Sequence, residues 1–148
     1  MKLFNGDDVV RQWPAVSGTG NFGSPKDQEK KGRPIPEGTY DIKQERYQEM
    51  DWLRRQLGGG LRWPGGTRSW GTERVWADPT KEAIANGLTF GRKDMAIHGG
   101  DVPGSVGCID LTTNMNDFAK TFRGRGADLK LYVDYNPPVP ENGLNRSR

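Results

Sequence analysis

The sequence predicts a mainly β domain with two or three short helices, and three observations support this fold class. The chain has 148 residues, a usual length for one domain with its own core. It holds 21 glycines and 10 prolines, while only 32% of its residues are hydrophobic. This composition is typical of short strands joined by turns and differs from that of a helical bundle. The third observation is residues 128–135, where Leu129, Leu131, Val133 and Tyr135 alternate with other residues as in a half-buried strand.

The N-terminal third is expected to form short strands joined by turns. Residues 9–18 are a candidate strand pair that Pro14 interrupts. A long polar loop, rich in glycine, proline and charge, is expected over 18–38. A further strand is predicted over 39–43, where apolar and polar residues alternate.

Three segments have helical patterns. Apolar residues recur at near-helical spacing over 44–57, and a run of glycines follows. Asp78 and Pro79 suit the N-cap and first position of a short helix that ends before Gly87. The clearest pattern covers 112–124, where apolar residues stand at i, i+3, i+4 and i+7 and a glycine follows.

The remaining segments complete the expected domain. Residues 61–71 are predicted as a loop, 72–78 as a strand, and 94–100 as a strand that runs into a glycine turn. The domain is expected to span 1–136, because the Pro-rich, polar residues 137–148 suggest a frayed tail.

Charge and hydropathy argue against two classes of partner. The net charge is +3, with lysines and arginines scattered along the chain, so no nucleic-acid partner is predicted. No apolar stretch approaches membrane-spanning length, so no stable membrane insertion is expected. The N-terminus lacks the apolar region of an ordinary signal peptide.

The segment "IHGGDVPGSVGCIDL" (97–111) holds the only histidine and the only cysteine, His98 and Cys108. A thiolate is a nucleophile, and a nearby imidazole can take its proton. A working pair needs the sulfur and a ring nitrogen within about 3–4 Å, in a cleft open to substrate. The backbone N–H groups of Gly107 and Cys108 could form an oxyanion hole. Ser105 could hydrogen-bond either the turn or the substrate.

The same residues have a simpler interpretation, which the sequence leaves open. A lone cysteine is often a small buried hydrophobe, and a lone histidine is often a structural polar group. One histidine and one cysteine are too few for an ordinary zinc site, so no metal or other cofactor is predicted. Four tryptophans could line a glycan or peptide groove, although packing is their commoner use: Trp52, Trp63, Trp70 and Trp76.

"IHGG" followed by "SVGCIDL" resembles the active-site signature of the L,D-transpeptidase catalytic domain, in which a His-Gly pair precedes a Ser-x-Gly-Cys stretch. "VVRQWPAVSG…GRPIPEGTYDI" is similar to the opening of that family. The resemblance covers roughly 3–135 and is poor over 44–70. Within the family, the pattern is most like that of compact L,D-transpeptidase-like toxins delivered by type VI secretion.

The resemblance implies an L,D-transpeptidase-like β-sandwich or barrel with a specific chemistry. Cys108 would be the nucleophile and His98 its base. The substrate would be a peptidoglycan stem tetrapeptide, cleaved after the L-centre of its third residue with release of D-alanine. Transfer of the acyl group to an amine would give a cross-link or D-amino-acid exchange, and transfer to water would give L,D-carboxypeptidase activity.

Three departures from the family pattern affect the expected site. The gap of ten residues between His98 and Cys108 is short (108 − 98 = 10), which suggests the compact subgroup. Val106 stands where many members have a second histidine. Asp110 stands where many have an arginine, and a structural role near the following helix is the favoured interpretation.

Other residues would then have to hold the substrate. The missing cation could be replaced by Arg74 or Arg92, and the sequence does not choose between them. Gly99 and Gly100 of the signature are further candidates for the substrate-binding site, together with Asp110.

The resemblance also suggests where the protein acts. The implied substrate is peptidoglycan, yet the sequence shows no ordinary signal peptide. This combination suggests an antibacterial effector, made in the cytoplasm and delivered into a target-cell periplasm. A fragment of a longer protein would look the same. A toxin implies a cognate immunity protein. The alternative function is a non-enzymatic cell-wall or partner-binding module with a silent, buried cysteine. A papain-like amidase fits less well, because that group places its cysteine before its histidine.

Overall fold

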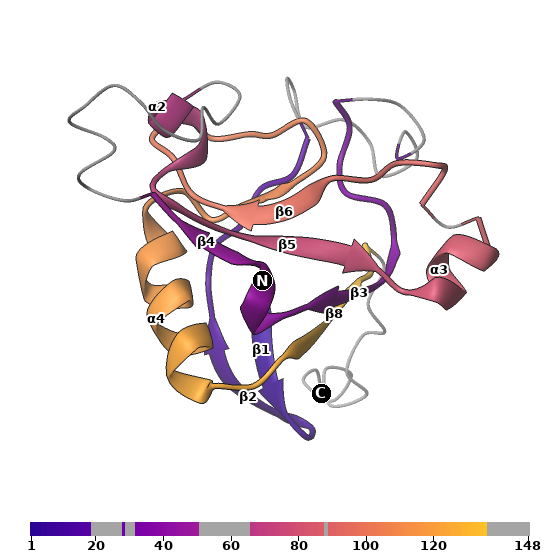
Figure 1. The fold of residues 1–148 in the computed structure, drawn as a ribbon, viewed down its shortest axis with the longest axis horizontal. Helices are drawn as coiled ribbons and strands as arrows, with labels where there is room; N and C mark the ends of the chain where they lie inside the picture. The colour runs from indigo at the N-terminus through magenta and orange to yellow at the C-terminus, as the bar shows by residue number, and fades with distance from the viewer. Residues whose placement is uncertain (19–27, 29–31, 51–65, 88, 136–148) are drawn as a thin grey trace, which may run out of the picture.

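The structure is a computed structural model that describes residues 1–18, 28, 32–50, 66–87 and 89–135 (Figure 1). The strands in this part are β1 (Lys2–Asn5), β2 (Asp8–Gln12), β3 (Gly38–Ile42), β4 (Tyr47–Glu49), β5 (Glu73–Pro79), β6 (Met95–His98), β7 (Ile109–Asp110) and β8 (Leu129–Val133). The α-helices are α2 (Gly66–Trp70), α3 (Lys81–Ala85) and α4 (Met115–Arg125). Short 3₁₀ turns cover Gln44–Arg46 and Thr112–Asn114.

Most strands belong to one curled sheet with β5 near its centre. The order is β7-β6-β5-β3-β8, and β4 also pairs with β5. The β1–β2 hairpin is a separate two-stranded sheet, and Figure 1 shows it crossing behind the main sheet. Together with three short helices in the described part, this confirms the predicted mainly β fold class.

One apolar core holds these layers together. It combines inward-facing residues of the sheet with the apolar face of α4, which Figure 1 shows along one side of the sheet. Trp13 meets Phe118 edge to face, with ring centroids 5.4 Å apart, and its indole N–H donates to Asp117 at 2.7 Å. Such an aromatic pair adds about 0.5–1.5 kcal/mol beyond the area it buries.

The strongest local patterns of the sequence are confirmed. The apolar residues predicted to form one face of α4 are all buried: Met115, Phe118, Ala119 and Phe122. The helix ends at Arg125 and not at Gly124, because Gly126 is the residue that adopts the left-handed conformation (φ 62°) of a C-cap. The strands predicted over 39–43, 72–78, 94–100 and 128–135 correspond to β3, β5, β6 and β8.

The helix predicted over 44–57 is wrong in its described part. Gln44–Arg46 form a single 3₁₀ turn, and Tyr47–Glu49 form β4, which pairs with β5. The Tyr47 hydroxyl donates to Glu73 at 2.6 Å across this pair. Pairing with a neighbouring strand therefore overrides the local helical spacing. The rest of the predicted helix lies outside the described residues.

The short helix around residue 80 begins later than predicted. Thr80 is the N-cap, and its hydroxyl accepts a hydrogen bond from the backbone of Ala83 at 3.2 Å. Asp78 and Pro79 belong to β5, where they pair with β3. The strand thus continues through the proline, which pairs near the end of β5.

Two loops and the N-terminal strands also differ in detail. Part of the loop predicted over 61–71 forms α2, and the part before Gly66 lies outside the described residues. The candidate strand pair over 9–18 holds β2, and Val16 makes only an isolated bridge to Asp110. The tail predicted over 137–148 and most of the loop predicted over 18–38 are likewise not described. No helix in the part of the chain that is described combines the length and apolarity needed to cross a bilayer.

Candidate active site

The segment that holds the sole thiol and imidazole connects two parallel strands. His98 ends β6, and Cys108 directly precedes β7. The parallel register sets Ile97 opposite Ile109 and His98 opposite Asp110. The two candidate catalytic side chains therefore come from adjacent strands at one edge of the sheet.

The hydrogen bond of His98 defines which ring nitrogen can act as a base. Its Nδ1 lies 2.7 Å from the carbonyl oxygen of Gly99, which can only accept. Nδ1 therefore carries the proton, and Nε2 is the unprotonated nitrogen. Nε2 is buried and has no hydrogen-bond partner among the residues that the structure describes. A buried acceptor left unpaired is uncommon in folded proteins and calls for an explanation.

Burial keeps the imidazole neutral. It is the main cause that lowers the pKa of His98 below its ordinary value, and the positive charge of Arg74 lowers it further. The Gly99 hydrogen bond and the charge of Asp110 act in the opposite direction. His98 is therefore neutral near pH 7, as a general base must be.

The thiol is also neutral in the resting structure. Burial raises the pKa of Cys108 to about 11. A backbone hydrogen bond from Ala96 and the charges of Arg74 and Arg92 partly offset this rise. The raised pKa of the Cys108 thiol and the lowered pKa of His98 both favour the neutral forms over a thiolate–imidazolium pair.

The pair differs from its predicted geometry in two respects. The Cys108–His98 hydrogen bond is not formed, because Nε2 of His98 has no partner. The two residues are also buried, with exposed fractions of 5% and 2%, and do not lie in an open cleft. The same charges, those of Arg74 and Asp110, act on both groups, which shows that they share one environment.

Two serine hydroxyls fix the backbone at the thiol. The Oγ atoms of Ser17 and Ser105 each donate to the carbonyl oxygen of Cys108 at 2.6 Å. Ser105 thus holds the turn and uses its donor on the protein itself. The sequence analysis does not predict this role of Ser17, because its contact with Cys108 spans 91 positions along the chain.

The nucleophile turn leaves backbone donors near the sulfur. Gly107 has a φ of 93°, a conformation that favours glycine. The N–H groups of Gly107 and Cys108 donate to no other residue in the described ranges. They are therefore suited to stabilise an oxyanion, as the sequence analysis predicts.

Asp110 has a structural position. It is fully buried, and its carboxylate accepts hydrogen bonds from the backbone N–H groups of Gly104 at 2.9 Å and Thr112 at 2.7 Å. It thereby fixes both the connection before Cys108 and the turn that leads into α4. These contacts agree with the structural interpretation favoured from the sequence.

Arg92 is occupied by the backbone of a neighbouring segment. Its guanidinium donates to the carbonyl oxygens of Gln28 at 2.5 Å, Pro34 at 2.7 Å and Arg33 at 3.0 Å. It also fills the space beside Gly107, where an added Cβ would lie 1.7 Å from Nη2. Arg92 therefore holds the backbone of Gln28, Arg33 and Pro34 against the nucleophile turn.

Arg74 is held differently. It lies on β5 directly opposite His98, and only 6% of its surface is exposed. Its Nε donates to the side-chain oxygen of Gln48 at 2.7 Å. Its guanidinium carbon lies 5.2 Å from the ring centre of Trp70 and 4.7 Å from that of Trp76. Arg74 is thus a buried cation between two aromatic rings, close to both reactive groups.

The glycines of "IHGG" allow close backbone packing. A Cβ on Gly99 would lie 2.6 Å from the carbonyl oxygen of Thr112 and 2.7 Å from Cβ of Met115. A Cβ on Gly100 would lie 2.8 Å from the backbone of Arg68 and Ser69. Packing alone therefore requires glycine at both positions, and their contact with substrate stays a prediction.

In the described residues, no group of three or more His, Cys, Asp or Glu side chains could hold a metal ion. The sequence alone does not indicate the partners of Arg74, because Gln48 and Trp70 reach it only through the fold. Trp52 and Trp63 lie outside the described residues.

A neutral imidazole, a sole thiol and a glycine turn whose N–H groups are unpaired among the described residues, on a curled β-sheet, are typical of a cysteine acyl-transfer domain. The L,D-transpeptidase catalytic domain (YkuD) matches residues 1–130, and the chain therefore belongs to this family, which acts on peptidoglycan peptides. A comparison with curated proteins finds no match to the chain.

Proposed function

We propose that the protein acts on peptidoglycan stem tetrapeptides as an L,D-transpeptidase, a D-amino-acid exchange enzyme or an L,D-carboxypeptidase. One observation supports this proposal more strongly than the others. Nε2 of His98 is buried, unprotonated and without a partner in the described part of the chain, and its strand β6 pairs with β7, which the sole thiol directly precedes. A nitrogen in this state is ready to accept a proton, which a merely structural histidine has no need to do.

The residues assign a role to each step of acyl transfer. Cys108 gives its S–H proton to Nε2 of His98, and the sulfur attacks the carbonyl that follows the L-centre of the third residue. The N–H groups of Gly107 and Cys108 stabilise the oxyanion. The C–N bond then breaks, and the imidazolium returns its proton to the amine of the departing D-alanine. The product on the enzyme is a thioester.

The second half of the reaction releases the enzyme. An amine or a water molecule loses a proton to His98 and attacks the thioester carbonyl, and the carbon–sulfur bond breaks. The proton then returns to the sulfur. An amine acceptor gives a cross-link or an exchanged D-residue, and water gives a shortened tripeptide.

Arg74 is the proposed anchor for the substrate's terminal carboxylate. Its charge already acts on the thiol, and it lies buried opposite His98. A guanidinium suits planar recognition of a carboxylate. Arg92 is a weaker candidate because it donates to three backbone carbonyls.

The biological role we propose is that of an antibacterial effector. The protein would be made in the cytoplasm, delivered into the periplasm of a target cell and neutralised in the producer by an immunity protein. Support comes from the short gap between His98 and Cys108 and from the "GSVGCI" sequence. Periplasmic expression should arrest growth of a bacterial host, whereas cytoplasmic expression or Cys108→Ala should not. Equal growth in all three cases would refute the effector role.

The activity is tested with purified stem tetrapeptide. We expect the wild-type protein to release D-alanine, with a tripeptide or an exchanged peptide as the other product, measured by mass spectrometry. Cys108→Ala should release none. If the wild-type protein is inert and Cys108→Ala changes only its stability, the alternative of a binding module with a silent cysteine is correct.

A further inference from the structure

The backbone of α2 packs directly on the glycines that follow His98. The backbone N–H of Asp101 donates to the carbonyl oxygen of Arg68 at 2.8 Å. Gly71 has a φ of 66°, and a Cβ there would lie 3.1 Å from the backbone of Gly99. A Cβ on Gly100 would lie 2.8 Å from the backbone of Arg68 and Ser69, so this glycine also packs against α2. The end of α2 is therefore fixed relative to the "IHGG" segment.

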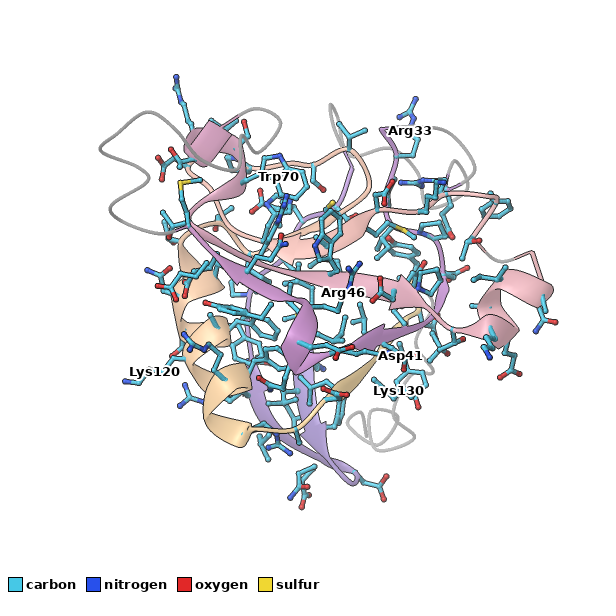
Figure 2. All side chains as sticks on the ribbon, viewed as in Figure 1. Arg33, Asp41, Arg46, Trp70, Lys120 and Lys130 are labelled. Atoms are coloured by element: carbon cyan, nitrogen blue, oxygen red, sulfur yellow. The ribbon has the colours of Figure 1, made fainter. Side chains whose placement is uncertain are left out.

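This packing sets the ring of Trp70 on the imidazole of His98. The ring centroids are 4.6 Å apart and the ring planes are inclined by 34°. Figure 2 shows Trp70 between α2 and the main sheet. The ring of Trp70 also contacts the guanidinium of Arg74 at 5.2 Å. Trp70 thus touches both the proposed base and the proposed carboxylate anchor.

The imidazole needs such a support. Rotation of a histidine ring about χ2 has broad, roughly two-fold preferences, so the backbone alone does not fix it. The Gly99 carbonyl holds only Nδ1. A flat ring packed against the imidazole face restricts the remaining tilt and excludes water from one side.

We infer that Trp70 is a positioning residue that holds the His98 imidazole in its base-ready orientation and shields it from water. This inference rests on the proposed function for its catalytic meaning, whereas the stacking itself does not depend on activity. Trp70 acts through the His98 ring against which it packs.

The test uses the fact that His98 is the only histidine. Its ring protons give a single set of NMR signals, which can be titrated in the full chain without any substrate. Trp70→Ala removes the cover that lowers the pKa of His98, so the midpoint should rise toward the ordinary value. Trp70→Phe keeps a stacking ring and should titrate close to wild type.

Trp76→Ala is the matched control. Trp76 also packs against the guanidinium of Arg74, at 4.7 Å, whereas the ring contact found at His98 is made by Trp70. Trp76→Ala should shift the His98 midpoint much less than Trp70→Ala does, because it removes no ring from the face of the imidazole. Equal midpoints in wild type and Trp70→Ala, or an equal shift in Trp76→Ala, would overturn the inference. If Trp70→Ala does not fold, Trp70→Leu takes its place; its smaller side chain leaves part of the imidazole face uncovered and should raise the midpoint by a smaller amount.

Turnover gives the second readout. Trp70→Ala should lower kcat by about threefold to tenfold, the factor expected from losing one aromatic contact, and Trp70→Phe should restore most of it. The acid limb of the pH profile should move upward with the NMR midpoint. If the wild-type protein releases no D-alanine by either transfer or hydrolysis, the proposed function fails, while the titration still decides whether Trp70 positions His98.

Discussion

Two arginines, one buried and one half-buried, act on the same thiol, and they are held in opposite ways. Arg92 donates to three backbone carbonyls and lies against Gly107, so its charge serves the shape of the nucleophile turn. Arg74 lies between two tryptophan rings, opposite His98, with Gln48 on its Nε. The comparison teaches that proximity to a nucleophile does not by itself assign a role. The partners of a cation separate a structural arginine from a candidate for substrate binding.

The largest expected effect concerns the pair of His98 and Cys108. His98→Ala removes the neutral nitrogen that takes the thiol proton, so kcat should fall by more than about 10³-fold. Release of D-alanine from tetrapeptide measures it. The melting temperature should be compared in parallel, since an activity loss that merely follows unfolding would not support a catalytic role.

Arg74→Gln should mainly weaken substrate binding. Loss of a charge-assisted bond to a carboxylate corresponds to about 1.5–3 kcal/mol, and KM should rise by roughly tenfold to a hundredfold. Steady-state kinetics on the tetrapeptide measures the change. An unchanged KM in a folded Arg74→Gln protein would remove Arg74 from the proposed binding site.

Arg92→Met should mainly lower stability. Three carbonyl oxygens would lose their donor, and we expect a loss of about 2–4 kcal/mol in the free energy of unfolding. Urea denaturation measures this loss, and KM below the unfolding transition should stay at the wild-type value. A rise in KM as large as that of Arg74→Gln would show that the two arginines share one role.

The pH dependence is the smallest effect and follows from the two pKa shifts. Because the pKa of His98 is lowered, activity should persist as the pH falls through the ordinary histidine range and disappear only at more acidic pH. Because the pKa of Cys108 is raised to about 11, its alkylation by iodoacetamide should still accelerate well above pH 9. The alkylation of glutathione, an exposed thiol, is the reference. A rate for Cys108 that levels off near pH 8 would contradict a buried thiol with a raised pKa.

The parts of the fold that follow from local pattern were predictable from the sequence. The buried face of α4 and the alternation in β8 are encoded within a few neighbouring residues. The segment around Tyr47 was not predictable in this way. Its spacing is helical, but pairing with β5 makes it a strand. Register between distant strands overrides such weak local preferences.

The candidate site was predictable only where a single residue of its type exists. His98 and Cys108 have no competitors in the chain, so the sequence alone names the pair. The partners of Arg74 depend on strand register and on the packing of α2, which no short motif encodes. For the same reason the contact of Ser17 with the Cys108 carbonyl could not be foreseen.

The central claim is that the buried thiol of Cys108 attacks a stem-peptide carbonyl when Nε2 of His98 takes its proton. Intact-mass spectrometry of the protein mixed with tetrapeptide and quenched in acid tests it most directly. The account predicts an adduct of the peptide minus D-alanine, located on Cys108 and absent in both Cys108→Ala and His98→Ala. Turnover without an adduct on Cys108 in any quench, or an adduct that forms equally well in His98→Ala, would contradict it.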